Sequence, residues 1–253
     1  MTTLLVDIGN TRVKWAWQRG VRLSRMHALA HGGGAAALRS VVRSAPRAVN
    51  RVLAVCVAGA KLERALDAAV RARFGLEVEF VRSARSAAKV RNGYRDTWRL
   101  GADRWVGIVG AHSIAPGRSV VIANIGTALT IDAVAASGRH LGGAIVPGPV
   151  AMVTSMLAGT HGIARRARGA SSPARPARGL FARDTARGLE AGACNAAGAV
   201  IDRAVTQARA VFGAMPLLLL TGGAAPALRP FLRNPVRLVP NLVLRGLAVL
   251  ARS

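Results

Sequence analysis

Residues suited to phosphate chemistry gather near the N-terminus, where Asp7, Gly9, Asn10, Thr11 and Lys14 occur in one short stretch. A glycine permits close approach of the backbone to a ligand, and Asn and Thr side chains donate hydrogen bonds to phosphate oxygens. A carboxylate can hold Mg²⁺, usually through water. Such residues are also common in ordinary hairpin turns, so this stretch alone leaves both interpretations open.

A second stretch of the same kind runs from Asn124 to Asp132, with the sequence Asn-Ile-Gly-Thr-Ala-Leu-Thr-Ile-Asp. Polar residues and a glycine again lie between two apolar segments, which predicts a second hairpin with a phosphate-binding turn. Neither stretch matches the G-x-x-x-x-G-K-[ST] pattern. A P-loop kinase is therefore not favoured.

Between these stretches, Gly101-Ala102-Asp103-Arg104 precedes an apolar segment that is predicted to be helical. Phosphoryl transfer to an alcohol needs a carboxylate to accept the hydroxyl proton and a cation to orient the acceptor. Asp103 and Arg104 fit these two roles. The alternative is a simple helix start with an acid in its first turn.

The elements that must position these residues alternate between strands and helices. In the first half, strands are predicted over 3–8, 12–18, 51–57 and 76–81, with helices near 34–46 and 60–73. In the second half, strands are predicted over 119–124, 127–135, 140–146, 216–220 and 236–239, with helices over 181–212 and from 241. The repeated pattern indicates a duplicated α/β fold, with an N-terminal half of residues 1–115 and a C-terminal half of residues 116–253.

The strongly basic composition, with a formal net charge of +25, raises the class of nucleic-acid-binding proteins. The cations are 33 Arg against 3 Lys in a chain rich in Ala and Gly, which is typical of codon bias in a GC-rich genome. Only 4% of the residues are aromatic, too few for stacking on single-stranded nucleic acid. We therefore expect no specific nucleic-acid partner.

The two cysteines, Cys56 and Cys194, lie in apolar segments and are expected to be buried free thiols. Asp7 interrupts the first apolar run, and no apolar stretch reaches the ~18 residues of a membrane span. The sequence therefore predicts a cytoplasmic protein with no membrane contact. Residues 164–179 lack apolar periodicity and are rich in Arg, Pro, Ser and Gly, so we expect a solvated linker there, with a basic lid over an anion as the alternative.

Four motifs in order resemble those of type III pantothenate kinases, which belong to the superfamily of acetate and sugar kinases, heat-shock chaperone ATPases and actin. They are D-x-G-N-T-x-x-K at 7–14, G-x-D-R at 101–104, G-T-A-x-T-x-D at 126–132 and G-G-x-I-x-P-G at 142–148. The resemblance runs from the first strand to residues 244–247. It implies duplicated ribonuclease H-like, actin-like ATPase domains with a central cleft for ATP.

The resemblance also implies an activity, the MgATP-dependent phosphorylation of pantothenate that begins coenzyme A synthesis, in a homodimer whose substrate pocket is completed by the second subunit. It assigns ATP contacts to Asp7, Ile8, Gly9, Asn10, Thr11, Arg12, Val13, Lys14 and Thr127, with Asp7 near Mg²⁺ through water. It assigns pantothenate contacts to Tyr94, Gly101, Ala102, Asp103, Arg104 and Thr185, with Asp103 as the general base.

One position departs from the family pattern. Many members carry an aspartate just before the second hairpin, where it helps to bind a monovalent cation, and here that position is Asn124. An amide oxygen can still coordinate K⁺ or NH₄⁺ but lacks the Coulomb attraction of a carboxylate. A requirement for K⁺ or NH₄⁺ is therefore in question.

Two other functions stay open at this point. An ATPase or phosphatase of the same superfamily would use an acid to activate water, although the G-x-D-R motif favours an alcohol acceptor. A nucleic-acid-associated regulatory accessory protein is the other alternative, motivated by the basic charge alone. The five histidines show no shared spacing, so packing is the expected role of each.

Overall fold

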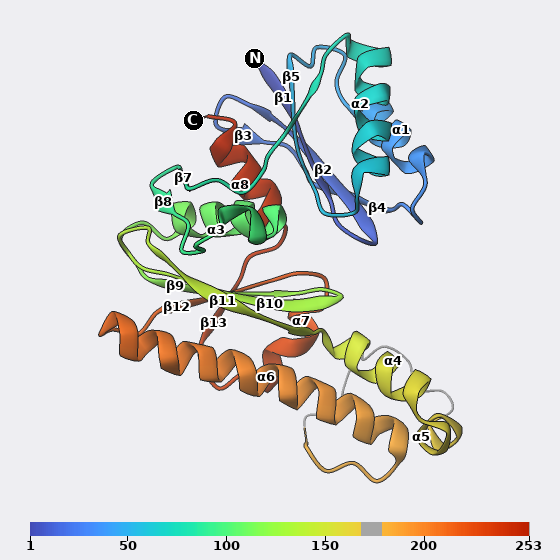
Figure 1. The fold of residues 1–253 in the computed structure, drawn as a ribbon, viewed down its shortest axis with the longest axis vertical. Coiled ribbons are helices and arrows are strands. Elements are labelled where there is room, and N and C mark those ends of the chain that lie inside the picture. Colours follow the sequence, from blue (N-terminus) through green and yellow to red (C-terminus); the bar gives the residue numbers. More distant parts are fainter. Residues whose placement is uncertain (168–178, 253) are drawn as a thin grey trace. The chain divides into compact units, whose positions relative to one another are not determined.

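The computed structural model describes residues 1–167 and 179–252, which form two compact units (Figure 1). The first unit comprises residues 1–116, 138–140 and those from Asn241 on, and the second comprises 117–137 and 141–240. The chain thus passes from the first unit to the second after Pro116, and its C-terminal helix returns to the first.

The first unit contains a sheet of six strands in the order β3-β2-β1-β5-β6, with β4 paired to β2. The predicted hairpin of β1 and β2 is antiparallel, and β5 and β6 continue the sheet in parallel, as expected of an α/β fold. Strands β3 and β4, which extend the hairpin, are short and were not predicted. The bounds are β1 Thr2–Ile8, β2 Arg12–Arg19, β3 Arg22–Leu23, β4 His27–Ala30, β5 Arg51–Cys56 and β6 Val78–Phe80.

Strand β1 is buried along its whole length because helices cover both faces of the sheet. Leu4, Val6 and Ile8 pack against α1 and α2, and Leu5 packs against α3 and α8. Since side chains alternate along a strand, Asp7 lies on the same face as Leu5. The helices are α1 Ala35–Ser44, α2 Ala60–Phe74, α3 Ala102–Ile114 and α8 Leu242–Leu250.

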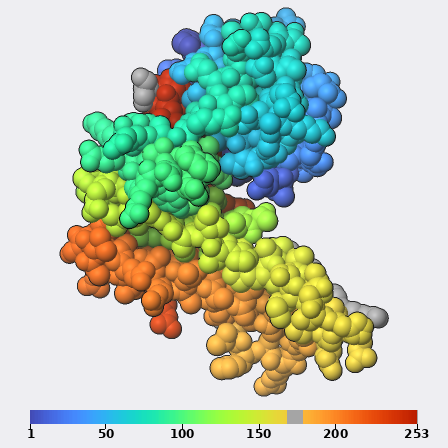
Figure 2. Space-filling view, viewed as in Figure 1, coloured from blue at the N-terminus to red at the C-terminus, as the bar shows by residue number. Residues whose placement is uncertain are grey.

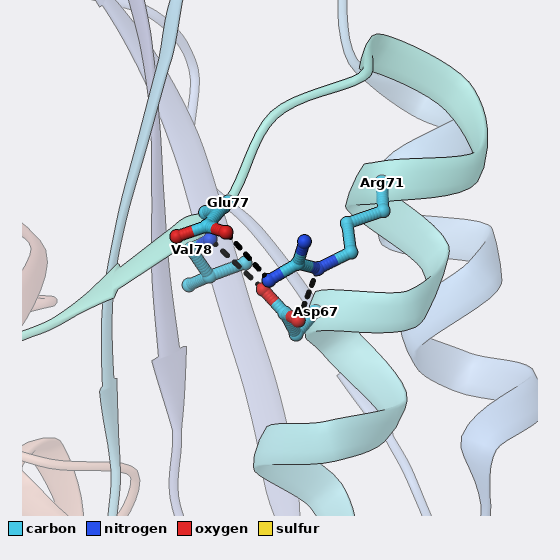
Figure 3. A network of polar contacts seen from close by, with 4 residues as sticks. All are labelled: Asp67, Arg71, Glu77 and Val78. Atoms are coloured by element: carbon cyan, nitrogen blue, oxygen red, sulfur yellow. Dashed lines mark hydrogen bonds and ion pairs between the residues drawn. The ribbon is translucent and has the colours of Figure 1, made fainter.

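A network of exposed polar contacts fixes the connection from α2 to β6 (Figure 3). Arg71 donates from Nε to Asp67 over 2.7 Å and from a terminal nitrogen to Glu77 over 2.9 Å. The other oxygen of Asp67 accepts from the backbone N–H of Val78 at 3.0 Å. The hydrogen bond from Arg71, and then the one from Val78, lower the pKa of the Asp67 carboxyl. This network therefore has a structural role.

The sheet of the second unit has the strand order β11-β10-β9-β12-β13, which corresponds to the order β3-β2-β1-β5-β6 of the first sheet. Strands β9 and β10 form the second antiparallel hairpin, and β12 and β13 continue the sheet in parallel. The duplicated α/β fold predicted from the sequence is therefore confirmed. The bounds are β9 Val120–Ile125, β10 Ala128–Val134, β11 His140–Pro147, β12 Leu217–Thr221 and β13 Val236–Leu238.

The long helix α6 Thr185–Phe212 covers one face of this second sheet through Cys194, Ile201 and Val205. It begins at Thr185 rather than near 181 because the Asp184 side chain accepts the N–H of Arg187 at 2.9 Å and caps the helix. The short helices α7 Ala225–Leu228 and η2 Arg229–Phe231 pack beside it.

Two helices that follow β11 and precede α6 in the chain were not predicted, namely α4 Pro149–Gly159 and α5 His161–Arg166. Together with the start of α6 they form an arm that projects from the second sheet (Figures 1 and 2). Residues 164–166, expected to belong to a linker, end α5. The rest of that Arg-rich segment, 168–178, lies outside the described residues.

Both cysteines are free and buried, as predicted, and burial raises the pKa of the Cys194 thiol to about 11. Their role is packing. Among the described helices, none combines the length and the apolar character needed to cross a bilayer.

Helices α3 and α8 cross at a pair of glycines. An added Cβ on Gly110 would lie 2.8 Å from both the backbone nitrogen of Gly246 and the carbonyl oxygen of Leu242. An added Cβ on Gly246 would overlap the carbonyl oxygen of Val106. Backbone atoms cannot move aside as a side chain can, so this crossing accepts only glycine. Because α3 begins at the G-x-D-R motif, the crossing also fixes the place of that motif.

We expect Gly246→Ala to lower the free energy of unfolding by about 3 kcal/mol, because the added methyl group must push the two helices apart. Urea denaturation followed by circular dichroism measures this value. The matched control is Gly107→Ala in α3, the other helix of the crossing, where an added Cβ meets nothing within 4 Å. Equal effects of the two substitutions would contradict the tight crossing.

Candidate active site

The first candidate phosphate loop is the turn between β1 and β2. The N–H of Gly9 donates to the carbonyl oxygen of Arg12 at 3.0 Å and closes the turn. Asn10 and Thr11 are exposed at its tip. The side chains of Ile8 and Val13 are fully buried in the core, so these two predicted ATP contacts can reach a nucleotide only through their backbone.

Asp7 is a buried carboxyl group at the end of β1, directly opposite Lys14 on β2. The pKa of Asp7 is raised to about 6, mainly by burial; the positive charge of Lys14 lowers it in part, and the negative charge of Asp103 adds to the rise. The influence of Asp103 places the two acids in one electrostatic environment. The hairpin and the G-x-D-R motif, far apart in sequence, thus lie near each other on the α3 face of the first sheet.

The surroundings of Asp7 fit a hydrated Mg²⁺ ion. Among the described residues, no hydrogen bond to its carboxylate is found, although the group is only 6% exposed. The described residues also contain no group of three or more His, Cys, Asp or Glu side chains arranged to hold a metal. Mg²⁺ that is bound through one or two carboxylates, substrate phosphates and water needs no such cage.

Asp103 lies in the first turn of α3, as predicted. Its carboxylate accepts the N–H of Arg104 at 2.8 Å. An added Cβ on Gly101 would lie 2.9 Å from the same carboxylate oxygen, although the backbone of Gly101 (φ −53°, ψ 135°) suits any residue. Gly101 is therefore required for the space that the Asp103 side chain occupies, not for backbone freedom.

Arg104 and Tyr94, two predicted substrate contacts, touch each other. A terminal nitrogen of Arg104 donates to the Tyr94 hydroxyl at 3.0 Å, and its guanidinium lies 5.6 Å from the ring centre. The other partner of the Tyr94 ring is His140, stacked at 6.0 Å with an angle of 9° between the rings. The Arg104 side chain is thus held in place while buried.

Asn92 organises the loop that carries Tyr94. It is buried, donates from its amide to Ala84 and accepts the N–H of Tyr94 at 3.0 Å. Neither Asn92 nor His140 was predicted to matter. The Asn-Gly pair just before Tyr94 was the signal that could have identified Asn92, since Asn side chains commonly bond the backbone two residues on.

A pocket of about 410 Å³ opens beside Tyr94. It lies at the small hairpin of β7 Ser86–Ala87 and β8 Val90–Arg91 and at the short helix η1 Thr97–Arg99. Three arginines line it, and within the described residues none of the three forms an ion pair. The positive charge of these arginines favours an anionic ligand in the pocket. The arginines, which sequence reasoning did not single out, are Arg85, Arg91 and Arg95.

The second unit carries the other predicted residues. The N–H of Gly126 donates to Ala128 at 3.0 Å, and the N–H of Gly148 donates to the carbonyl oxygen of Thr127 at 2.9 Å. These two hydrogen bonds fix the backbone of the turn, and Thr127 is exposed on it. A glycine N–H thus closes both turns, although Gly9 bonds to the third residue after it and Gly126 to the second.

Asn124 lies between Thr130 and Thr221 on the neighbouring strands, at the end of β9. An added Cβ on Gly222 would lie 2.7 Å from the Asn124 amide oxygen, so the backbone passes close to it. These neighbours are neutral. Thr185 is the first residue of α6, on the projecting arm.

The sequence profile of the family described as type III pantothenate kinase matches residues 3–207. The chain belongs to this family. A type III pantothenate kinase of Aromatoleum aromaticum is 39% identical over 99% of this chain and 98% of the relative. Another, from Nitrosococcus oceani, is 35% identical over 99% of this chain and 94% of the relative.

Solved structures of other activities share the fold of this family member. A ROK family glucokinase from Streptomyces griseus, in complex with glucose and AMPPNP, has a TM-score of 0.51 at 15% identity and covers 100% of this chain and 99% of its own. Component A of (R)-2-hydroxyglutaryl-CoA dehydratase from Acidaminococcus fermentans has a TM-score of 0.56 at 16% identity, with coverages of 99% and 96%. These likenesses confirm the ribonuclease H-like, actin-like fold.

The raised pKa of Asp7 predicts a stability that falls as the pH rises. The folded protein holds this proton up to pH about 6, whereas the unfolded chain releases it near 3.8, so ionisation of Asp7 opposes folding above this range. Asp7→Asn should therefore raise the free energy of unfolding of the ligand-free protein by up to about 3 kcal/mol at pH 8, and by much less at pH 4.

Urea denaturation with EDTA at pH 4, 6 and 8 measures this difference. Asp67→Asn is the matched control, because the lowered pKa of Asp67 gives stability above its unfolded pKa and thus predicts a loss rather than a gain. A gain for Asp7→Asn that is equal at every pH would contradict the assignment.

Proposed function

We propose that this protein transfers the γ-phosphoryl group of ATP to a hydroxyl of pantothenate, the first step of coenzyme A synthesis. One observation supports this most directly, namely that Asp7 and Asp103 interact on the α3 face of the first sheet. An acid that holds Mg²⁺ and an acid that accepts a proton must lie close together for phosphoryl transfer. The motif order and family membership supply the substrate, and the cytoplasm is the expected location.

In the proposed mechanism, Asp103 accepts the proton of the attacking hydroxyl while Arg104 and Tyr94 hold pantothenate. Gly101 and Ala102 line the same helix start. The pocket with three arginines draws in the carboxylate of pantothenate. Asp7 would hold Mg²⁺ through water, and the bound ion would neutralise part of the phosphate charge.

The predicted ATP contacts extend over both units. The stretch from Asp7 to Lys14 offers backbone N–H groups, the Asn10 and Thr11 side chains and two cations, Arg12 and Lys14. Thr127 offers a hydroxyl on the second hairpin. We propose that each half, residues 1–115 and 116–253, thus contributes one phosphate loop. Asn124, among neutral neighbours, binds K⁺ or NH₄⁺ weakly, so turnover should depend little on the choice of cation.

We further propose a homodimer formed through the projecting arm. Several apolar side chains of the arm and of the segment just before α6 are exposed, including Phe181 in that segment, which is 95% exposed. Such a patch indicates a protein interface. Thr185 begins α6 in the arm and would complete the pantothenate pocket of the second copy. The other large apolar residues exposed in the arm and in the segment before α6 are Val150, Met156 and Leu180.

The deciding measurement is ADP release from MgATP with and without pantothenate, in Na⁺, K⁺ or NH₄⁺. Asp103→Asn should lower kcat by about 100- to 10,000-fold with little change in pantothenate binding, because it removes the general base. Arg104→Ala should instead weaken pantothenate binding. ADP release that does not need pantothenate would favour an ATPase or phosphatase, and no release in any cation would favour a binding protein.

Gly101→Ala tests the space around the base. The added methyl group must displace the Asp103 carboxylate, the free end of a side chain, so the free energy of unfolding should change by less than about 1 kcal/mol. We expect kcat to fall at least about tenfold because the base is misplaced. The same ADP assay and urea denaturation separate the two effects, and an unchanged kcat would count against Asp103 as the base.

A mixing experiment tests the shared pocket. Asp103→Asn and Thr185→Val should each have little activity as homodimers. If Thr185 acts on the second copy, exchanged heterodimers contain one intact site, and an equal mixture should recover about a quarter of the wild-type activity. Light scattering gives the mass. A monomer, or no recovery after proven exchange, would contradict the proposed dimer.

A further inference from the structure

His31, expected only to pack, holds both ends of the first phosphate loop. The residue follows β4 and is buried, at 8% exposure. One ring nitrogen, Nε2, lies 2.8 Å from the carbonyl oxygen of Gly9. Its backbone N–H donates to the carbonyl oxygen of Thr11 at 3.3 Å. The two contacts flank Asn10, the residue at the tip of the turn.

The hydrogen-bond partners fix the tautomer of the ring. Nδ1 accepts the backbone N–H of Gly33 at 3.0 Å, so it must carry a lone pair. The proton is therefore on Nε2, which donates to the carbonyl oxygen of Gly9. Each ring nitrogen thus has one backbone partner.

The chain after His31 is built to present this partner. Gly32 and Gly33 both have positive φ values, 53° and 74°, which residues other than glycine adopt only at a cost in free energy. The N–H of Gly34 then bonds back to the carbonyl oxygen of His31 at 2.8 Å. This tight turn brings the Gly33 N–H to the imidazole.

The contact at Gly9 sets the direction of a phosphate donor. A trans peptide is planar, so the carbonyl of Gly9 and the N–H of Asn10 point in opposite directions. Because the carbonyl points at the buried imidazole, the Asn10 N–H points away from it. By the same geometry, the backbone bond to Thr11 directs the N–H of Arg12.

We propose that His31 is a positioning residue for nucleotide binding, which aims the N–H groups of the β1–β2 turn at the phosphate oxygens of ATP. This proposal rests on the proposed function of the hairpin as a phosphate loop. His31 itself touches no substrate. Its contribution is preorganisation, since a free loop would have to be ordered each time that a nucleotide binds.

Two conservative variants separate the two ring contacts. In His31→Gln the side-chain amide reaches the place of Nε2 and retains a donor for Gly9, whereas in His31→Asn it reaches only the place of Nδ1. Isothermal titration with MgATP should show affinity lowered about tenfold for His31→Asn and His31→Ala, and within about threefold of the wild type for His31→Gln. KM for MgATP should follow the same order, with KM for pantothenate nearly unchanged.

His27→Ala is the matched control. It removes an imidazole from β4, the strand that precedes His31, but this ring stacks on Trp15 and Trp17 and, among the described residues, forms no hydrogen bond with the turn. Any loss of stability should therefore leave MgATP affinity unchanged. Hydrogen exchange of the 9–12 backbone should become faster in His31→Ala but not in His27→Ala.

Equal MgATP affinities for His31→Gln and His31→Asn, or an unchanged affinity for His31→Ala, would overturn the proposal. Titration with MgATP needs no acceptor, so wild-type protein that binds MgATP without turning over pantothenate would count against the proposed function alone. Wild-type protein that does not bind MgATP would overturn both.

Discussion

The burial of the Asp7 carboxyl at the end of a central strand is the constraint on which the first half of the molecule depends. A carboxylate without hydrogen-bond donors is costly in such a place, and its pKa of about 6 records that cost. Lys14 offsets part of the cost from the neighbouring strand, and Asp103 adds to it. An arrangement that lowers the stability of the ligand-free protein in this way is expected where a divalent cation completes the site.

The two sheets share one strand order, yet their hairpins differ in charge. The first turn has Asp7 and Lys14 on facing strands, and the second has Asn124 among threonines. Duplication therefore preserved the strand order and a glycine N–H that closes each turn, while the turn lengths and the side chains diverged. The first hairpin suits a metal–phosphate complex, and the second suits neutral hydrogen bonding to phosphate.

Residues that take no part in the proposed reaction fix the positions of the site residues. The glycine crossing of α3 and α8 sets the place of the helix that begins at Asp103, and α8 shares a core with Leu5 of β1. On the other side, Asn92 and His140 hold the Tyr94 ring against Arg104. These contacts restrict the motion of side chains, which is the condition for accurate placement of reacting groups.

The sequence by itself determined the duplicated α/β fold, both hairpins and the start of α3, because apolar periodicity and turn residues are local signals. It also predicted Asp7, Asp103 and Arg104 as site residues by residue type and motif order. Only the tertiary structure decided the contact of Tyr94 with Arg104, the roles of Asn92 and His140, and the bond from His31 to Gly9. Helices α4 and α5 also escaped prediction. Such pairings join residues that are distant in sequence, and a lone histidine or asparagine carries no periodic signal that could reveal its partner.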